Sequence, residues 1–387
     1  MNVRRFCLLQ DVLSCPTSPF CERAVIEYVR SWASRCGVSF TQDAAGNVLL
    51  SAGRSKDGAR RGKAKARVSK TPTWVFTAHM DHPGFVVRRS RGRSVWATFR
   101  GGVAKTYFPG SRVRLITRDA EYVATVATVR KSKEHHALDC RLELVDQSAR
   151  NVAPGSIGMW DVPTFKRRNG RLTARACDDL AGVAAVMTAI EEIISRNPDA
   201  NVMGLLTRAE EVGFVGTLAA CRLGTIPAGA LVVGIETSKA QPAAKIGGGA
   251  VIRVGDGTRV FNEPLTAHIS AVAKDLANRN KDFQFVRQLM PGGTCESTAF
   301  CALGHLAGAL ALPLGNYHNQ HPRGQIAAEF IDEGDFDCLV NLLVALATDK
   351  RSPADTEAAL LHRLDDILAR QSPSLEATGP WSPCGSA

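Results

Sequence analysis

The chain has 387 residues, of which 45% are hydrophobic and 22% are charged, and it carries a formal net charge of +11. This length can bury a large core, is typical of two domains, and has the composition of an ordinary soluble globular protein. The apolar stretches are too short to span a bilayer. The N-terminus lacks the apolar run and cleavage site of a signal peptide, so we expect a cytoplasmic protein with no membrane partner.

The cysteines and the basic residues each narrow the function. Eleven scattered cysteines with no Cys-x-x-Cys pair indicate free thiols rather than a disulfide framework or a thiolate zinc site. The positive charge is concentrated in residues 54–70 and 85–114, which hold eight basic side chains each. Such tracts can attract nucleic acid or acidic substrates. The first tract has no aromatic residues and no hydrophobic period, so we interpret it as a solvated loop and do not expect nucleic-acid binding.

The first part of the chain reads as the start of a larger domain, followed by an insertion. Residues 21–36 show helical periodicity, residues 38–50 predict two strands around a turn, and residues 73–78 predict a strand that ends at His79. From 88 to 162 the pattern changes to short alternating segments separated by Gly and Pro. This stretch predicts a small all-β domain inserted into the larger one, for assembly or substrate access.

The second part alternates between helix and strand. Helices are expected at 179–195, 217–223, 265–278 and 333–347, and strands at 201–207, 230–235 and 305–312. This order predicts an α/β fold whose mostly parallel sheet is flanked by helices. The larger domain would then comprise residues 1–87 and 163–350, with 88–162 as the insert. Residues 351–387 form a tail that is helical at about 355–370 and then Ser- and Pro-rich, which we expect to be loosely attached or disordered.

The adjacent carboxylates Asp178 and Asp179 begin the longest helical pattern. Two neighbouring carboxylates could cap that helix, because Asp is favoured at the N-cap and in the first turn. They could also bind a cation, which would offset their mutual repulsion. On this stretch alone both interpretations stay open.

Further metal-binding side chains follow other predicted strands. His79, Glu210, Glu211, Glu236 and His318 each follow an apolar segment. Because ligand crevices of open α/β sheets lie at the carboxyl ends of the strands, we expect these side chains to converge there. Nitrogen and oxygen ligands suit zinc, with cobalt or manganese as alternatives.

Two divalent metal ions would fit this set. A dinuclear site needs one bridging carboxylate and about two further ligands for each ion. The expected ligands are His79 and Glu236 on one ion and Glu211 and His318 on the other, with Asp178 shared. Glu210 is left free to act as a general base on a metal-bridging water. Asp81, two residues beyond His79, would accept a hydrogen bond from its second ring nitrogen. Asp179 would fix the geometry of Asp178, and capping would be a secondary effect.

The ordered motifs resemble the tetrahedral, or glutamyl (deblocking), aminopeptidases, a family of co-catalytic dinuclear zinc exopeptidases. The matching motifs are Ala78-His79-Met80-Asp81-His82-Pro83-Gly84-Phe85, Arg175-Ala176-Cys177-Asp178-Asp179-Leu180-Ala181-Gly182, Ala209-Glu210-Glu211-Val212-Gly213, Gly234-Ile235-Glu236-Thr237, Gly292-Gly293-Thr294 and Tyr317-His318. The resemblance covers about residues 8–347. It implies aminopeptidase activity on peptide substrates, a small β domain used in assembly, homo-oligomers, and the ligand and base roles assigned above.

The chain departs from this family at several positions. Cys295 and Glu296 follow Gly-Gly-Thr where the family more often has Asp and a small residue, Glu236 is often Asp, and His82 stands where an acidic residue is common. His318 and His321 are both available as the last ligand, and we favour His318. Two other functions stay open: a metal-dependent amidohydrolase or deacylase of N-acylated small molecules, and a catalytically inactive relative of the fold.

Overall fold

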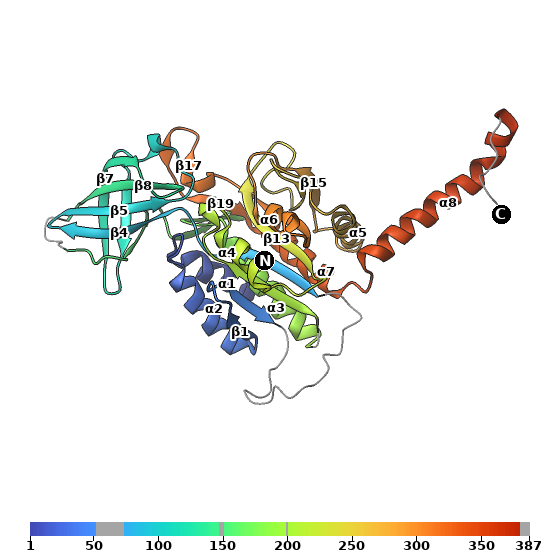
Figure 1. Ribbon diagram of the computed structural model, residues 1–387, viewed down its shortest axis with the longest axis horizontal. Coiled ribbons are helices and arrows are strands. Elements are labelled where there is room, and N and C mark those ends of the chain that lie inside the picture. Colours follow the sequence, from blue (N-terminus) through green and yellow to red (C-terminus); the bar gives the residue numbers. More distant parts are fainter. Residues whose placement is uncertain (52–72, 147–150, 199, 380–387) are drawn as a thin grey trace.

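The computed structural model describes residues 1–51, 73–146, 151–198 and 200–379. The basic tract predicted to be a solvated loop, residues 54–70, lies outside these ranges. Three bodies are visible in Figure 1: an α/β body in the centre, a β-barrel at one end and a long helix projecting from the other. The described helices are α1 (Val3–Ser14), α2 (Arg23–Cys36), α3 (Leu180–Arg196), α4 (Val215–Leu223), α5 (Glu263–Arg279), α6 (Glu296–Ala302), α7 (Glu333–Thr348) and α8 (Pro353–Thr378).

The α/β body is built on one large mixed sheet. Its strands lie in the order β1 (Ser39–Gln42), β2 (Val48–Ser51), β12 (Val202–Thr207), β3 (Trp74–His79), β13 (Leu231–Lys239), β16 (Leu306–Leu314), β14 (Ala250–Gly255) and β15 (Phe285–Leu289). The central strands β12, β3, β13 and β16 are parallel. Antiparallel pairing joins β2 to β12 and β16 to β14. The expected α/β class with a helix-flanked sheet is therefore confirmed, with antiparallel strands toward the edges.

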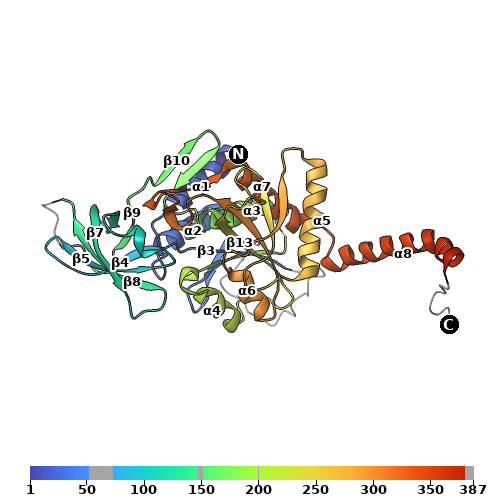
Figure 2. The same ribbon diagram turned by 90° about the horizontal axis from the view of Figure 1, so that it is seen from above.

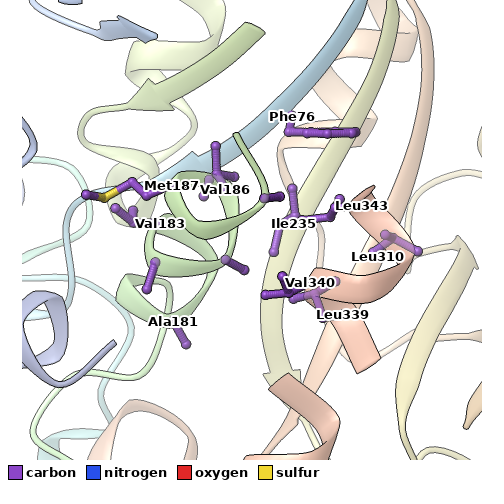
Figure 3. Close-up of a cluster of buried hydrophobic side chains, with 14 of the residues drawn as sticks. Phe76, Ala181, Val183, Val186, Met187, Ile235, Leu310, Leu339, Val340 and Leu343 are labelled. Carbon is purple, nitrogen blue, oxygen red and sulfur yellow. The ribbon is translucent and has the colours of Figure 1, made fainter. Parts of the chain in front are cut away.

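Both faces of this sheet are buried, because apolar residues alternate between two helical layers. On β3, Phe76 points to the layer that contains α3 and α7, whereas Val75 points to the layer that contains α4 and α6. Figure 3 shows the first layer, where α3 and α7 pack their apolar side chains against β3, β13 and β16. A strand covered on both faces leaves its carboxyl end as the place where polar side chains can gather.

The inserted β segment forms a closed barrel. Its strands follow the order β4 (Gly84–Arg91), β5 (Ser94–Arg100), β8 (Ala137–Leu144), β7 (Glu121–Lys131), β6 (Arg112–Ile116) and β9 (Ile157–Trp160). Closure pairs every strand on both sides and so removes exposed sheet edges. The core is aromatic, since Phe85, Phe99, Phe108 and Trp160 are all buried and their rings lie 4.8–6.1 Å apart.

The remaining described elements are short. They are the sheet β10 (Phe165–Arg168), β11 (Arg171–Ala174) and β19 (Glu329–Asp332), the pair β17 (Gln320–His321) and β18 (Gln325–Ile326), and the 3-10 turns η1 (Lys105–Tyr107), η2 (Glu210–Val212) and η3 (Tyr317–Asn319). Among the residues described, no helix has the length and apolarity needed to cross a membrane.

The sequence patterns missed several elements and misjudged others. Helix α1 was not predicted, although its Asn2 side chain caps it and its Leu8–Leu13 face is buried. Strands β14 and β15 and helix α6 were also missed. Strand β13 continues to Lys239, so Glu236 lies within it rather than after it. Residues 371–378, for which we predicted no helix, continue α8, which ends at Thr378.

Candidate metal centre

The predicted ligands meet at the carboxyl ends of the central strands. His79 is the last residue of β3, Glu210 and Glu211 begin η2 directly after β12, and His318 lies in η3 after β16. Glu236 lies at the same edge of the sheet, because the pairing of β13 with β3 ends at Gly234, two residues before it. Most of these side chains line a cleft of about 290 Å³ that also contains Tyr317 and the Gly292–Thr294 turn.

Two triads of possible metal ligands form at this cleft. Each triad has its ligand atoms within 4.8 Å of one another: His79, Glu210 and Glu236 in the first, and Asp178, Glu211 and His318 in the second. The His79 Nε2 atom lies 3.5 Å from Glu236 Oε1 and 3.9 Å from Glu210 Oε2. The His318 Nε2 atom lies 3.1 Å from Glu211 Oε1.

Asp178 lies between the two histidines. Its Oδ1 is 3.4 Å from His79 Nε2 and its Oδ2 is 3.4 Å from His318 Nε2. Each carboxylate oxygen therefore faces a different triad, which is the arrangement that a carboxylate shared by two ions requires. The peptide bond between Asp178 and Asp179 is cis.

The residues present fit a pair of divalent cations. Two buried carboxylate oxygens, Asp178 Oδ1 and Glu211 Oε1, have no hydrogen-bond partner. Four carboxylates converge on only two imidazoles, which is costly for buried charges unless cations offset their repulsion. Nitrogen and oxygen donors in this number are typical of zinc, cobalt or manganese sites.

The electrostatics of the side chains show the same excess of negative charge. Burial raises the pKa of Glu210 well above its usual value, and Glu236 and Glu211 raise it further. Burial also raises the pKa of Glu236, to about 7. Burial would lower the pKa of the His79 imidazole, but Glu210 and the other facing carboxylates outweigh it and raise that pKa well above 6.5. Side chains whose pKa values are raised in this way hold protons that metal cations can replace.

Asp179 does not cap α3 with its side chain, so that part of the capping interpretation is wrong. It occupies the N-cap position, but its Oδ1 accepts a hydrogen bond from Thr237 Oγ1 at 2.7 Å instead of from the helix N–H groups. The carboxylate is fully buried over Gly182, where a Cβ atom would lie 2.3 Å from Oδ2. Glycine at 182 therefore makes room for Asp179 beside the bridging aspartate.

Glu329, a buried residue on β19, holds two of the ligand segments in place. Its Oε2 accepts hydrogen bonds from the N–H groups of Cys177 and Asp178, at 2.7 and 3.1 Å. Its Oε1 accepts from the His318 N–H at 2.7 Å. Sequence reasoning missed this residue, because its partners are backbone groups far away in the chain and leave no motif.

The described part of the barrel domain contacts the site through the segment between β5 and β6. His318 Nδ1 lies 2.8 Å from the carbonyl oxygen of Gly102, in the connection between β5 and β6. A proton on Nδ1 would leave Nε2 free to face Asp178 and Glu211, so this carbonyl selects the tautomer. His318 has φ of +53°, a conformation that non-glycine residues adopt only when their surroundings impose it.

Asp81 and His82 hold the loops around the triads. The Asp81 carboxylate accepts hydrogen bonds from the N–H groups of Glu210 and Glu211, at 2.9 and 3.1 Å. His79 Nδ1 lies 3.1 Å from the Asp81 carbonyl oxygen and 3.6 Å from its carboxylate, so the closer contact is with the main chain rather than with the expected side chain. His82 Nδ1 lies 2.6 Å from the Asp178 carbonyl oxygen.

His321 lies on β17, outside both triads. Its Nδ1 accepts a hydrogen bond from the Arg323 N–H at 3.1 Å, and its carbonyl accepts one from the Tyr107 hydroxyl. Among the described residues, the ligand groups therefore include His318 and not His321. Of the two histidines that the sequence offered as the last ligand, the geometry therefore favours His318.

Comparisons with known proteins point to one family. A family model described as M42 glutamyl aminopeptidase matches residues 59–328, more than half of the chain. No curated protein matched the chain. Among solved structures, a TET aminopeptidase from a marine-sediment Thaumarchaeota archaeon has a TM-score of 0.71 at 18% identity, covering 92% of this chain and 99% of that one.

Two further structures are similar to the same extent. An aminopeptidase from the archaeon Desulfurococcus kamchatkensis has a TM-score of 0.70 at 19% identity and covers 92% of this chain and 97% of its own. The TET1 peptidase of Pyrococcus horikoshii, described as able to assemble into a tetrahedron or a large octahedral shell, has a TM-score of 0.69 at 19% identity, over 89% and 99% of the two chains.

Proposed function

Because the chain belongs to the M42 glutamyl aminopeptidase family and is therefore a metal-dependent aminopeptidase, we propose that it removes N-terminal residues from peptides at a site for two divalent cations. The observation that carries this proposal is the placement of Asp178, whose two oxygens each face the histidine of a different triad. The proposed ligands are His79 and Glu236 for one ion and Glu211 and His318 for the other, with Asp178 shared.

Zinc is the proposed metal, with cobalt or manganese as alternatives that the same donors would accept. When bound, the two ions would polarise the scissile carbonyl and lower the pKa of the attacking water. The side chains of the protein would hold the substrate carbonyl between the triads and transfer the proton of the attacking water.

Glu210 is the proposed general base. Its carboxylate belongs to the first triad and lines the cleft, and its position is set by the hydrogen bond from its N–H to Asp81. It would take the proton of the attacking water and return it to the nitrogen of the leaving amine. Burial and the neighbouring carboxylates raise its pKa, which strengthens the group as a base and allows it to act as an acid in the second step.

The barrel is proposed to shape the site as well as access to it. Gly102 contacts the His318 ring, and the Tyr107 hydroxyl donates to the carbonyl of His321 in the same loop. The described barrel residues thus contact the loop that carries a proposed ligand. We also propose a homo-oligomeric state, because the similar P. horikoshii peptidase is described as assembling into closed shells.

Paired histidine substitutions test the proposed ligand set. His318→Ala should lose bound metal, as measured by elemental analysis of the purified protein, and should lose activity with it. His321→Ala should keep both. Retention of full metal content by His318→Ala would defeat the assignment.

A substrate panel separates peptidase from deacylase activity. We expect hydrolysis of peptides with a free N-terminus and none of the matching N-acylated peptides. The opposite preference would favour an amidohydrolase that uses the same ions.

A further inference from the structure

Helix α8 projects from the body, and its first turns, as far as Arg363, lie against α5. Figures 1 and 2 show it extending away from the α/β body on the side opposite the barrel. Its start is fixed by a capping box between Ser352 and Asp355. Next to this start, Thr356 Oγ1 lies 2.8 Å from His268 Nδ1 of α5, and Arg351 binds Asp275 of α5. None of the residues of α8 is buried.

The exposed helix carries an apolar stripe, defined by Leu360, Leu361, Leu364, Ile367, Leu368 and Leu375. Their exposed fractions are 36–54%. At about 100° per residue these positions fall on one side of the helix. Three stripe residues, Leu361, Leu364 and Leu368, and the neighbouring Gln371 on the same side follow one another in steps of three and four, which is the spacing of helices that pair. A stripe of this size on a projecting helix indicates an interaction surface.

The charges of α8 restrict what can cover the stripe. The helix contains five acidic side chains and two arginines. Helices that lie on anionic membranes, and surfaces that bind nucleic acid, are instead rich in Lys and Arg. The net negative charge therefore favours a protein partner.

The positions of the charges beside the stripe favour a second copy of α8. Arg363 and Arg370 lie along one edge of the stripe, and Asp365 lies along the other. If two copies pair in parallel about a two-fold axis, the basic edge of one lies beside the acidic edge of the other. Antiparallel pairing would place the basic edge of one helix beside the basic edge of the other, so that arginine faces arginine. Parallel pairing also brings the two Gln371 side chains together, where they can hydrogen-bond.

We propose that α8 is a self-association element, which pairs in parallel with α8 of a second copy of this chain through the apolar stripe. The helix lies beyond residues 59–328, the part that matches the family model. The paired segment from Leu361 to Gln371 ends before Pro373, which lies inside α8 and interrupts its hydrogen bonding. It is about 15 Å long and spans fewer heptads than independent coiled coils need. The pairing therefore acts together with other contacts between copies, which raise the local concentration of the helices.

Charge insertion into the stripe tests this interface. Leu364→Asp should raise the dissociation constant of the α8-linked species at least tenfold, as measured by analytical ultracentrifugation of the full chain over a range of concentrations. Ala369→Asp adds the same charge on the other side of α8 and is the matched control, which should behave as the wild type. Equal mass distributions for both variants and the wild type would overturn the proposal.

Cysteine cross-linking tests the parallel arrangement. Gln371→Cys should form a disulfide-linked dimer under mild oxidation, because equivalent positions meet only in parallel pairs. Ala369→Cys and the wild type give the background from native thiols such as the exposed Cys7. A yield at background level would overturn the proposal, as would binding of wild-type α8 to phosphatidylcholine vesicles that Leu364→Asp abolishes without any change in cross-linking.

Discussion

The barrel and the crevice of the large sheet bury opposite kinds of side chain. The barrel encloses aromatic rings such as Phe99 and Trp160 and exposes the arginines of β4. The crevice encloses carboxylates and imidazoles that come from β3, from β13, from the segments after β12 and β16, and from the start of α3. In the barrel, packing provides the stability, and three of the six pairings join strands that are consecutive in sequence. In the crevice, charge is buried at a cost that bound ions would offset.

Because of this difference, we expect substitutions in the two regions to have different effects. Loss of a barrel side chain should weaken the fold and leave each folded molecule active. Loss of a side chain in the crevice should weaken chemistry or metal binding and leave the fold intact. The following predictions test that separation, beginning with the largest expected effect.

Glu210→Gln should lower kcat by about 10²–10⁴-fold, because the amide cannot accept the proton of the attacking water. Metal content and thermal stability should stay close to those of the wild type, since neither Asp81 contact involves the side chain of residue 210. Steady-state kinetics and elemental analysis of the same preparation measure both. A variant with normal turnover would remove Glu210 from the mechanism.

Phe99→Ala should lower the free energy of unfolding by about 3–5 kcal/mol, because it removes a buried ring from a close-packed cluster. Phe99 is fully buried, and its ring lies 4.8 Å from that of Phe85 and 4.9 Å from that of Phe108. Denaturant titration gives the stability, and kcat per folded molecule should stay unchanged. A fall in kcat at unchanged stability would show that the two regions do not fail separately.

Glu329→Gln should weaken metal binding by about 10–100-fold, the usual loss when a partner of the ligands is removed. The amide NH₂ group would face an N–H donor where a carboxylate oxygen accepts hydrogen bonds in the wild type. Saturating metal should restore most of the kcat. Chelator competition measures the affinity, and an unchanged affinity would reduce Glu329 to a structural residue.

Metal binding should strengthen as the pH rises. Burial raises the pKa of Glu236 from 4.5 to about 7 in the metal-free chain. Its contribution to the stability of that chain is therefore complete below pH 4.5 and is lost as the pH rises through about 7. The raised pKa values of His79 and His318 act in the same direction.

Ions displace these protons, so the affinity should increase about tenfold per pH unit for each proton released. Titrations with buffered metal between pH 6 and 8 measure the slope. The rise in melting temperature on adding metal should also be larger at pH 8 than at pH 6. An affinity independent of pH would show that the ligands are already deprotonated.

Much of the site was predictable because its residues follow a local rule. His79, Glu210 and Glu236 each come at or near the end of an apolar β-run, and parallel strands place such ends at one edge. Helix α3 was predictable for a similar reason, since a continuous apolar run leaves a strong local pattern. Helix α1 was missed because its amphipathic pattern is short and interrupted by charges.

The sequence by itself determined the α/β class, and it predicted a set of candidate metal-binding side chains and an inserted β segment. Only the tertiary structure decided that Asp178 faces both histidines, that Asp179 turns to Thr237 instead of the helix, and that Glu329 holds two ligand segments. The physical reason is that these contacts join residues far apart in the chain, often through backbone N–H groups, which every residue type possesses. Local patterns report burial and turn chemistry, whereas the direction of each buried carboxylate depends on which distant groups the fold brings to it.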